Sequence, residues 1–297
     1  MIVNSPAQPL VTVGIPVRNG GASLDQSLAS LTGQTLPNLR FLISDNASDD
    51  DTQAICEAWV ARDERIRYVR QPQNIGPTGN FLFVLSEART PYFMWAAHDD
   101  FWFPEFIAEN LAVLESRPDV VCCVSEVELV DIPVLPVPLI PGTAPLLADG
   151  HSNLIEYLRE PGANSRIYGL YRTHVLQHCF RAGDTYWAFD WAIVARTLMW
   201  GRHALVPRTL MRRQCRGESS DALRSIPRYN RSWFTRRFPM LPFTWALLTD
   251  STIPWTPALL RSLLHWNRVY LKNSLRRFRH RRIYPLLETL GLRPCAG

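Results

Sequence analysis

The sequence has almost no lysine. Of its 32 basic residues, Lys272 is the single lysine and the rest are arginine. A nucleotidyltransferase needs a glycine-rich, lysine-bearing loop to hold a nucleoside triphosphate, and the sequence has no such loop. This absence argues against an enzyme that releases pyrophosphate from a triphosphate.

Long apolar runs are also missing. No stretch approaches 18 uninterrupted apolar residues, and the first ten residues, MIVNSPAQPL, are polar and broken by proline. We therefore expect neither a membrane-spanning helix nor a secretory signal. The six cysteines show no Cys-x-x-Cys spacing, and Cys122 and Cys123 lie within an apolar run. This pattern predicts buried thiols in a reducing cytosol rather than disulfides or zinc ligands.

What the chain does have is ample apolar content and an uneven charge. The hydrophobic fraction of 46% is sufficient for a large core. Residues 218–297 carry 14 Lys and Arg against 4 Asp and Glu, whereas residues 1–217 carry 18 against 23. We therefore expect two regions: a folded domain over residues 1–217 and a basic, aromatic-rich helical region over residues 218–297.

Four apolar runs in the first third of the chain each end in small polar residues, and each is followed by a helical pattern. The runs lie within LVTVGIPVRNGG (10–21), RFLISDNASDD (40–50), IRYVRQPQNIGPTGN (66–80) and YFMWAAHDDFWFPE (92–105). Such an order predicts a mainly parallel α/β sheet whose polar strand ends meet at one edge. An α/β protein binds nucleotides and their divalent cation at this edge.

The rest of the domain has less regular patterns. A strand is expected over 120–131, an irregular but packed segment over the proline-rich 132–150, and a strand and turn leading into a helix over 165–176. A further helix begins near Asp190. By itself this carboxylate can be a helix cap or a catalytic group.

The motifs IPVRNGG, ISDNASDD, Asn74-Ile75-Gly76 with Asn80, AAHDDFWFPE and Asp190, in this order, resemble the family 2 inverting glycosyltransferases over residues 10–217. The resemblance implies a GT-A fold: a Rossmann-like, mixed but mainly parallel sheet flanked by helices, here followed by a helical basic appendage. It also implies transfer of a sugar from a nucleoside-diphosphate donor to a glycan or polyprenyl-linked acceptor, in cytoplasmic assembly of surface polysaccharide.

The resemblance implies a donor pocket made by three loops. It places Asp45 as acceptor for the ring N3–H of uracil or thymine, which favours UDP or dTDP. Independently of the resemblance, residues 18–21 form a loop that leads into a helix, so their backbone N–H groups are expected to face a phosphate. His98 is expected to bond the ribose or sugar, with a structural imidazole as the alternative. The other nucleotide-binding residues are Pro16, Val17, Arg18, Asn19, Asn46, Ser48, Asn74, Gly76, Asn80 and Asp99.

The metal motif departs from the family pattern. Pro104 sets the register, so that Ala97 replaces the first aspartate and Asp99 stands at the metal-binding second aspartate. Binding of Mg²⁺ or Mn²⁺ should then rest on Asp99, the donor diphosphate and waters, with Asp100 acting indirectly.

An inverting transfer needs a base for the acceptor hydroxyl, and the resemblance implies Asp190 for this role, with Asp184 as the alternative. The resemblance further implies that a glycine, a short strand and an Arg/His-rich turn follow the helix that begins near Asp190. The turn's usual histidine is missing near Gln214 and Cys215. Arg212, Arg213 or Arg216 could neutralise the leaving phosphates instead.

The basic region allows two interpretations that are compatible. Its arginines, leucines and aromatics could lie on an anionic membrane, at the inner face of the plasma membrane, or form an appendage packed on the domain. No nucleic-acid-binding module is recognisable, so no nucleic acid partner is expected. Because the metal motif is altered, a non-catalytic nucleotide- or glycan-binding subunit is the alternative to an enzyme.

Overall fold

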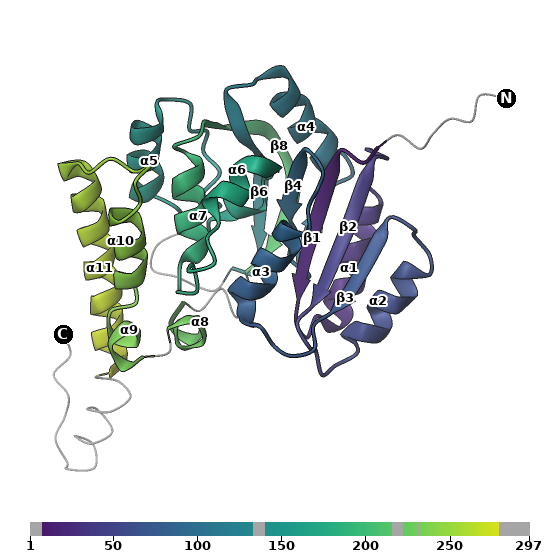
Figure 1. Cartoon of the computed structure of the whole chain (residues 1–297), viewed down its shortest axis with the longest axis horizontal. Helices are drawn as coiled ribbons and strands as arrows, with labels where there is room; N and C mark the ends of the chain where they lie inside the picture. Colours follow the sequence, from purple (N-terminus) through teal and green to yellow (C-terminus); the bar gives the residue numbers. More distant parts are fainter. Residues whose placement is uncertain (1–7, 133–139, 216–221, 231, 279–297) are drawn as a thin grey trace, which may run out of the picture. The chain divides into compact units, whose positions relative to one another are not determined.

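The structure is a computed structural model that describes residues 8–132, 140–215, 222–230 and 232–278 (Figure 1). The chain divides into two compact units. The first comprises residues 1–185 and 189–217, and the second comprises residues 186–188 and 218–297.

The first unit is a mixed α/β structure. Its strands are β1 (Val11–Val17), β2 (Leu39–Asp45), β3 (Ile66–Arg70), β4 (Tyr92–Trp95), β5 (Phe101–Trp102), β6 (Val120–Val130), β7 (Leu170–Arg172) and β8 (Arg202–Gln214). Its helices are α1 (Gly21–Thr32), α2 (Thr52–Val60), α3 (Gly76–Ser86), α4 (Phe106–Ser116), α5 (Gly150–Arg159), the 3₁₀ helix η1 (Ser165–Tyr168), α6 (Thr173–Cys179) and α7 (Phe189–Thr197).

The eight strands form one sheet in the order β3-β2-β1-β4-β7-β6-β8-β5. The pairings of β1 with β2, β2 with β3, β1 with β4 and β6 with β8 are parallel, whereas β7 is antiparallel to both of its neighbours and β5 to β8. The strand order reverses between β1 and β4, which is where open α/β sheets bind ligands. The predicted mainly parallel sheet is confirmed.

Both faces of β1 are buried, because its side chains alternate between two helices. Val13 and Ile15 belong to the same core cluster as Leu28 of α1. Gly14 points to the opposite face, where an added Cβ would lie 2.8 Å from Val84 of α3 and 2.7 Å from the Phe93 ring. Helices α1 and α3 therefore cover opposite faces, and α3 packs so closely that position 14 requires glycine.

Two elements differ from the sequence-based expectation. The strand after α7 is not short: β8 has 13 residues and pairs along most of β6, with a register shift at Pro207, which lacks an N–H for the ladder. Helix α5 was not expected. The described residues 140–149 between β6 and α5 are irregular as predicted, whereas 133–139 lie outside the described residues.

The second unit contains four helices in its described part: α8 (Ala222–Tyr229), α9 (Trp233–Arg237), α10 (Leu241–Leu248) and α11 (Pro257–Phe278). Among the residues that the structure describes, no helix combines the length and apolar character needed to cross a bilayer. Five cysteines lie in the described ranges, and all five are buried free thiols, as predicted.

Candidate functional site

The carboxyl ends of β1, β2 and β3 stop in register. Val17 pairs with Asp45, and Asp45 pairs with Arg70. Strand β4 pairs with the other side of β1, where Trp95 of β4 lies opposite Gly14 of β1. The segment 96–100 that follows β4 therefore continues beside the β1–α1 loop. The predicted polar strand ends therefore share one edge of the sheet.

The loops that follow β1 and β2 are fastened to each other. Three successive backbone N–H groups of the first loop donate to side chains of the second: Asn19 to Ser48 (2.9 Å), Gly20 to Thr52 (2.8 Å) and Gly21 to Asp50 (3.0 Å). These N–H groups therefore have protein acceptors, and the expectation that they face a phosphate is wrong for residues 19–21. The bonds make a rigid double loop, in which Asn19 and Ala47 adopt positive φ angles.

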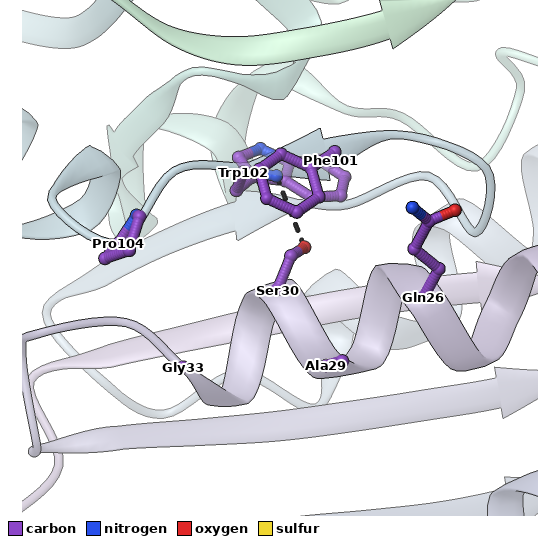
Figure 2. Close-up of a pocket in the computed structure, with 7 residues that line it drawn as sticks. All are labelled: Gln26, Ala29, Ser30, Gly33, Phe101, Trp102 and Pro104. Atoms are coloured by element: carbon purple, nitrogen blue, oxygen red, sulfur yellow. Dashed lines mark hydrogen bonds between the residues drawn. The ribbon is translucent and has the colours of Figure 1, made fainter.

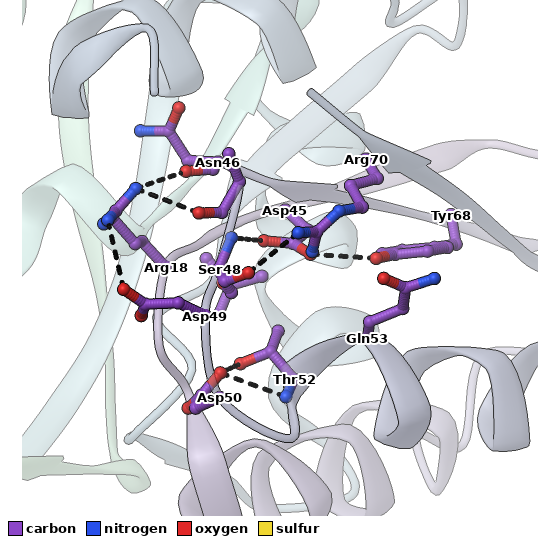
Figure 3. Close-up of polar contacts among 12 residues, drawn as sticks. Arg18, Asp45, Asn46, Ser48, Asp49, Asp50, Thr52, Gln53, Tyr68 and Arg70 are labelled. Carbon is purple, nitrogen blue, oxygen red and sulfur yellow. Dashed lines mark hydrogen bonds and ion pairs between the residues drawn. The ribbon is translucent and has the colours of Figure 1, made fainter. Parts of the chain in front are cut away.

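Asp45 is fully buried and accepts three hydrogen bonds (Figure 3). Ser48 donates its N–H to Oδ1, and the Tyr68 hydroxyl and the Arg70 guanidinium donate to Oδ2, each at 2.8 Å. Arg70 also reaches the Ser48 carbonyl at 2.8 Å. Burial and the nearby Asp45 carboxylate raise the pKa of the Tyr68 hydroxyl, which therefore stays a donor. The Asp45 carboxylate is thus paired within the protein.

Asn46 joins the third loop to this cluster. Its amide nitrogen donates to Asn74 Oδ1 (3.0 Å) and to the Gly76 carbonyl (3.1 Å), and its oxygen accepts the N–H of Ile75 (2.8 Å). Arg18 lies over the same loop and donates to the Asn46 carbonyl at 2.9 Å (Figure 3). Four of the predicted nucleotide-binding residues are therefore linked around one asparagine.

Asn80 is placed differently from the other predicted ligands. It is 3% exposed, donates to the carbonyls of Val17 and Ser44, and accepts from the Ser44 hydroxyl at 2.6 Å. Its amide group therefore holds α3 against the ends of β1 and β2. Pro16 and Val17 form the buried end of β1 itself.

The segment after β4 carries His98, Asp99 and Asp100. Ser27 of α1 anchors it through the Ala97 carbonyl (3.0 Å), and the His98 ring lies beside the β1–α1 loop, 3.4 Å from where a Cβ on Gly20 would stand. His98 and Asp99 are partly exposed, whereas Asp100 is 4% exposed. Asp99 therefore faces solvent at this edge and Asp100 points inward.

Arg213 is the cation that faces these acids. Its Nε lies 4.0 Å from Asp100 Oδ2, and the backbone N–H of the next residue, Gln214, donates to Asp100 Oδ1 at 2.9 Å. Desolvation, the largest effect, and the charge of Asp99 together raise the pKa of Asp100 to about 7, although Arg213 opposes them. Arg212 points to the other face of β8 and pairs with Glu128, and Arg216 lies outside the described residues.

Asp190 lies in the first turn of α7 and is held by a chain of two hydrogen bonds. Asn164 Nδ2 donates to Asp190 Oδ2 at 2.8 Å, and the Tyr157 hydroxyl donates to Asn164 Oδ1 at 2.9 Å. The Tyr157 bond fixes which end of the Asn164 amide faces the acid. Desolvation raises the pKa of Asp190, while the Asn164 bond and the charge of Arg213 lower it. Asn164 and Ala188 both have positive φ angles beside this carboxylate.

Tyr168 lies close enough to Asp99, Asp100 and Asp190 for all three charges to affect the pKa of its hydroxyl. Burial raises the pKa of its hydroxyl, Arg213 lowers it, and Asp99, Asp100 and Asp190 raise it. The Arg213 guanidinium stacks over the Tyr168 ring, with 5.0 Å between its central carbon and the ring centre. Arg213 also reaches Ser165 and the Ala163 carbonyl, which flank Asn164. Three acids from two separate segments therefore lie near the Tyr168 hydroxyl, and Arg213 packs on the ring of the same tyrosine.

Asp184, the alternative base, takes part in an ion pair. It forms a buried, two-point ion pair with Arg196 of α7, with N–O distances of 2.6 and 3.1 Å, and both side chains are 3% exposed. Removal of a carboxylate held in this way would leave the Arg196 charge buried without its partner, so Asp184 has a structural role.

Two pockets of the first unit lie away from this site. One lies between α1 and β5 and is lined by Gln26, Ala29, Ser30, Gly33, Phe101, Trp102 and Pro104 (Figure 2). It contains none of the predicted site residues. Within the described ranges, no group of three or more His, Cys, Asp or Glu side chains could hold a metal ion by itself.

Sequence comparison matches residues 12–145 to the model of glycosyl transferase family 2. Residues 12–145 belong to this family. The chain is also similar to the abequosyltransferase RfbV of Salmonella typhimurium, with 32% identity over 117 residues, which are 38% of this chain and 35% of RfbV. In eight curated glycosyltransferases, RfbV among them, the matched stretches cover between 15% and 37% of the relative, so the chain spans well under two thirds of these proteins.

Solved structures extend the likeness beyond the family 2 domain. S. aureus TarS 1–349 in complex with UDP-GlcNAc has a TM-score of 0.63 and 15% identity, covering 92% of this chain and 73% of TarS. The mannosyltransferase PcManGT from Pyrobaculum calidifontis, in complex with GDP-Man and Mn²⁺, has a TM-score of 0.59 and 16% identity, covering 96% and 79%. At these identities the likeness concerns the fold, and it confirms the predicted GT-A architecture.

The sequence analysis missed four residues that the structure places at the site. Tyr68 and Arg70 had a signal, because they are two residues apart at the end of a strand and thus face the same side as Asp45. Tyr157 and Asn164 had none, because their link to Asp190 spans 26 residues or more and depends on tertiary packing.

Proposed function

We propose that the chain is an inverting glycosyltransferase that moves a sugar from a nucleoside-diphosphate donor to a glycan or lipid-linked glycan in surface polysaccharide synthesis. The observation that carries the proposal is the acidic cluster at the edge of a GT-A sheet: Asp190 and Asp100 share Arg213, and Asp99 lies next to Asp100. We further propose that this reaction takes place in the cytoplasm, with UDP or dTDP as the favoured donor nucleotide.

Asp190 is the general base in this proposal. Inversion at the anomeric carbon is a single displacement, so the acceptor hydroxyl must lose a proton to a group on the face opposite the leaving diphosphate. Burial raises the pKa of Asp190, which makes its ionised form a stronger base than an exposed aspartate. Asn164 and Tyr157 act as positioning residues, because they fix the orientation of the carboxylate.

Asp99 is the residue that would hold Mg²⁺ or Mn²⁺. Mg²⁺ in nucleotide-dependent enzymes often binds through one or two carboxylates plus substrate phosphates and waters, and a single, partly exposed Asp99 fits that mode. When bound, the ion would neutralise charge on the departing diphosphate. Arg213 lies beside Asp100 and also acts on Asp190, so its positive charge would reduce the repulsion between these two carboxylates.

Asp45 defines the proposed base pocket. A carboxylate offers about four acceptor positions, and three are used by Ser48, Tyr68 and Arg70, which leaves one for a ring N3–H. The Arg70 side chain covers Asp45 but is itself 38% exposed. Donor binding therefore requires Arg70 to swing outward or to bond the base beside Asp45.

The decisive experiment compares Asp190→Asn with Asp119→Asn, a control at an exposed surface ion pair. Asp190→Asn should bind donor nucleotide like the wild type and lose transfer by about 10² to 10⁴, the usual contribution of a general base. Asp119→Asn should retain both. Full transfer by Asp190→Asn would remove this residue from the role.

Calorimetry tests the donor side separately. UDP, dTDP and GDP are titrated into the wild type and Asp99→Ala, with and without Mn²⁺. Metal-dependent binding of a pyrimidine diphosphate that is lost in Asp99→Ala supports the assignment. Metal-independent binding without donor hydrolysis or transfer would favour a non-catalytic nucleotide-binding subunit instead.

A further inference from the structure

The second unit exposes large apolar side chains next to cations. Trp245 of α10 is 71% exposed, Trp255 of the following turn 66%, and Leu264 of α11 54%. Between residues 233 and 278 the sequence has seven Arg and Lys and a single acid, Asp250, which is buried. Exposed aromatics of this size without acidic neighbours mark an interaction surface rather than an ordinary solvated face.

Helix α11 has two distinct faces. Leu259 and Leu263 are buried, and residues on the opposite side are exposed. With 100° between successive residues, the exposed side divides into an apolar strip and an adjacent basic strip. The apolar strip is Leu260, Leu264 and Leu275, and the basic strip is Arg261, Arg268 and Lys272. Helix α11 therefore has a buried apolar side, and its exposed side is itself divided into an apolar and a basic part.

Helix α10 adds its tryptophan to the same side. Figure 1 shows α10 and α11 side by side and running in opposite directions, and Asn267 Nδ2 contacts Thr244 Oγ1 at 2.6 Å. When each helix of an antiparallel pair is viewed along its own axis from its N-terminus, residues rotated in the same direction from the contact lie on the same face of the pair. Trp245 is rotated in this direction from Thr244 on α10, and Leu264 is rotated in the same direction from Asn267 on α11. Trp255 caps the hairpin, because its Nε1 donates to the Leu248 carbonyl at 2.8 Å.

We propose that this hairpin face, made of Trp245, Trp255, Leu260, Leu264, Arg261, Arg268 and Lys272, docks on an anionic lipid bilayer. Tryptophan combines an apolar ring with a polar N–H and is favoured at the boundary between acyl chains and headgroups. Leucines can enter the acyl boundary while guanidinium groups remain at the level of the lipid phosphates. The proposal is independent of the proposed reaction, because docking needs neither donor nor acceptor.

A bilayer explains the hairpin face better than a folded protein partner. A protein interface depletes charge at its centre and keeps it at the rim. Here the basic strip runs along the whole apolar strip, so each leucine has a cation one turn or less away. A planar sheet of phosphates above an apolar layer is complementary to that pattern along its full length.

The test is flotation of the full-length chain with vesicles. Wild type should bind vesicles of phosphatidylcholine with one third phosphatidylglycerol and should not bind phosphatidylcholine alone. Each cation near the surface strengthens binding about fivefold, so Arg261→Gln/Arg268→Gln/Lys272→Gln should weaken it about a hundredfold. Trp245→Ser/Trp255→Ser should weaken it at least about tenfold. Salt at 0.5 M should release the wild type.

Trp200→Ser is the matched control, because Trp200 is 47% exposed but belongs to the first unit. It should float like the wild type. All variants keep residues 279–297 unchanged, so a loss in the hairpin variants cannot come from the basic end of the chain. Equal flotation of the wild type and both hairpin variants would overturn the proposal. A wild-type dimer that Trp245→Ser/Trp255→Ser converts to a monomer, without wild-type flotation, would overturn it in favour of a second copy of the chain.

Discussion

The candidate site has two sides, a proposed nucleotide side around Asp45 and an acidic side around Asp100 and Asp190. Their carboxylates differ in how well they are bonded. On the nucleotide side, Asp45 is fully buried and accepts hydrogen bonds from a backbone N–H, a phenol and a guanidinium. On the acidic side, Asp100 and Asp190 both have raised pKa values because burial outweighs their bonds, and the cation nearest to Asp100 is 4.0 Å away.

This difference separates structural carboxylates from reactive ones. A buried carboxylate with matched donors stabilises the folded chain, and its removal leaves those donors without an acceptor. A carboxylate that burial disfavours lowers stability in its ionised form and gains reactivity toward protons or cations. Substitutions on the nucleotide side should therefore act first on folding, and those on the acidic side first on transfer.

Asp184 gives the strongest test of the structural class, because it lies only six residues before Asp190 in the chain. Asp184→Asn leaves the buried Arg196 guanidinium without its counter-charge, so the free energy of unfolding should fall by about 3–5 kcal/mol. Chemical denaturation measures this. Replacing both partners, as Asp184→Leu with Arg196→Met, should recover part of the loss. A stable Asp184→Asn variant without transfer activity would instead make Asp184 a candidate base.

Asp45→Asn compares the two sides directly. The substitution removes the charge that Tyr68, Arg70 and Ser48 bond, and we expect a loss of about 3 kcal/mol in the free energy of unfolding together with loss of donor binding. Asp190→Asn is the matched change on the acidic side. At pH 8 it should leave stability unchanged or raise it, because it removes an ionised group that burial disfavours. Equal losses in the two variants would contradict the distinction.

Asn164→Ala tests the support of the proposed base. Asp190 must be ionised to accept a proton and its pKa is raised, so kcat/KM should increase with pH along a limb that lies above the ordinary aspartate value of 3.8. The Asn164 bond lowers that pKa, so its removal should move the limb to higher pH. The misplaced carboxylate should also lower kcat about tenfold to a hundredfold.

Asn153→Ala is the control for Asn164→Ala. Asn153 is also buried on or near α5, and its amide bonds the backbone of Ala148 and does not contact Asp190. It should lower stability without moving the pH profile. If both variants shift the profile equally, the effect is a general loosening of the unit and Asn164 is no positioning residue.

The nucleotide side was largely predictable from the sequence, and the acidic side only in part. Asp45, Asn46 and Ser48 directly follow a strand with buried Val and Ile neighbours, and parallel strands bring such ends together whatever the loops do. Arg213 lies near both Asp100 and Asp190 because β7 inserts antiparallel between β4 and β6 and β8 extends along β6. That arrangement depends on pairings between distant segments, which residue spacing does not reveal.

Helix α5 shows a different limit. Its signals were present: Asp149 accepts the N–H of Ser152 as a helix cap, and Leu154 and Leu158 lie four residues apart on the buried side. These signals lie at the end of and just after the proline-rich segment 132–150, for which the sequence predicts irregular structure. As a result the position of Tyr157, and with it the support for Asn164, could not be anticipated.

Tyr68→Phe should have a smaller effect than Asp45→Asn and refines the comparison within the nucleotide side. It deletes one hydrogen bond to Asp45 while Ser48 and Arg70 remain, so the free energy of unfolding should fall by about 1–2 kcal/mol, well below the Asp45→Asn loss. Nucleotide affinity, measured by calorimetry, should change less than tenfold, because the acceptor survives. A loss as large as that of Asp45→Asn would mean that the phenol, rather than the guanidinium, keeps Asp45 in place.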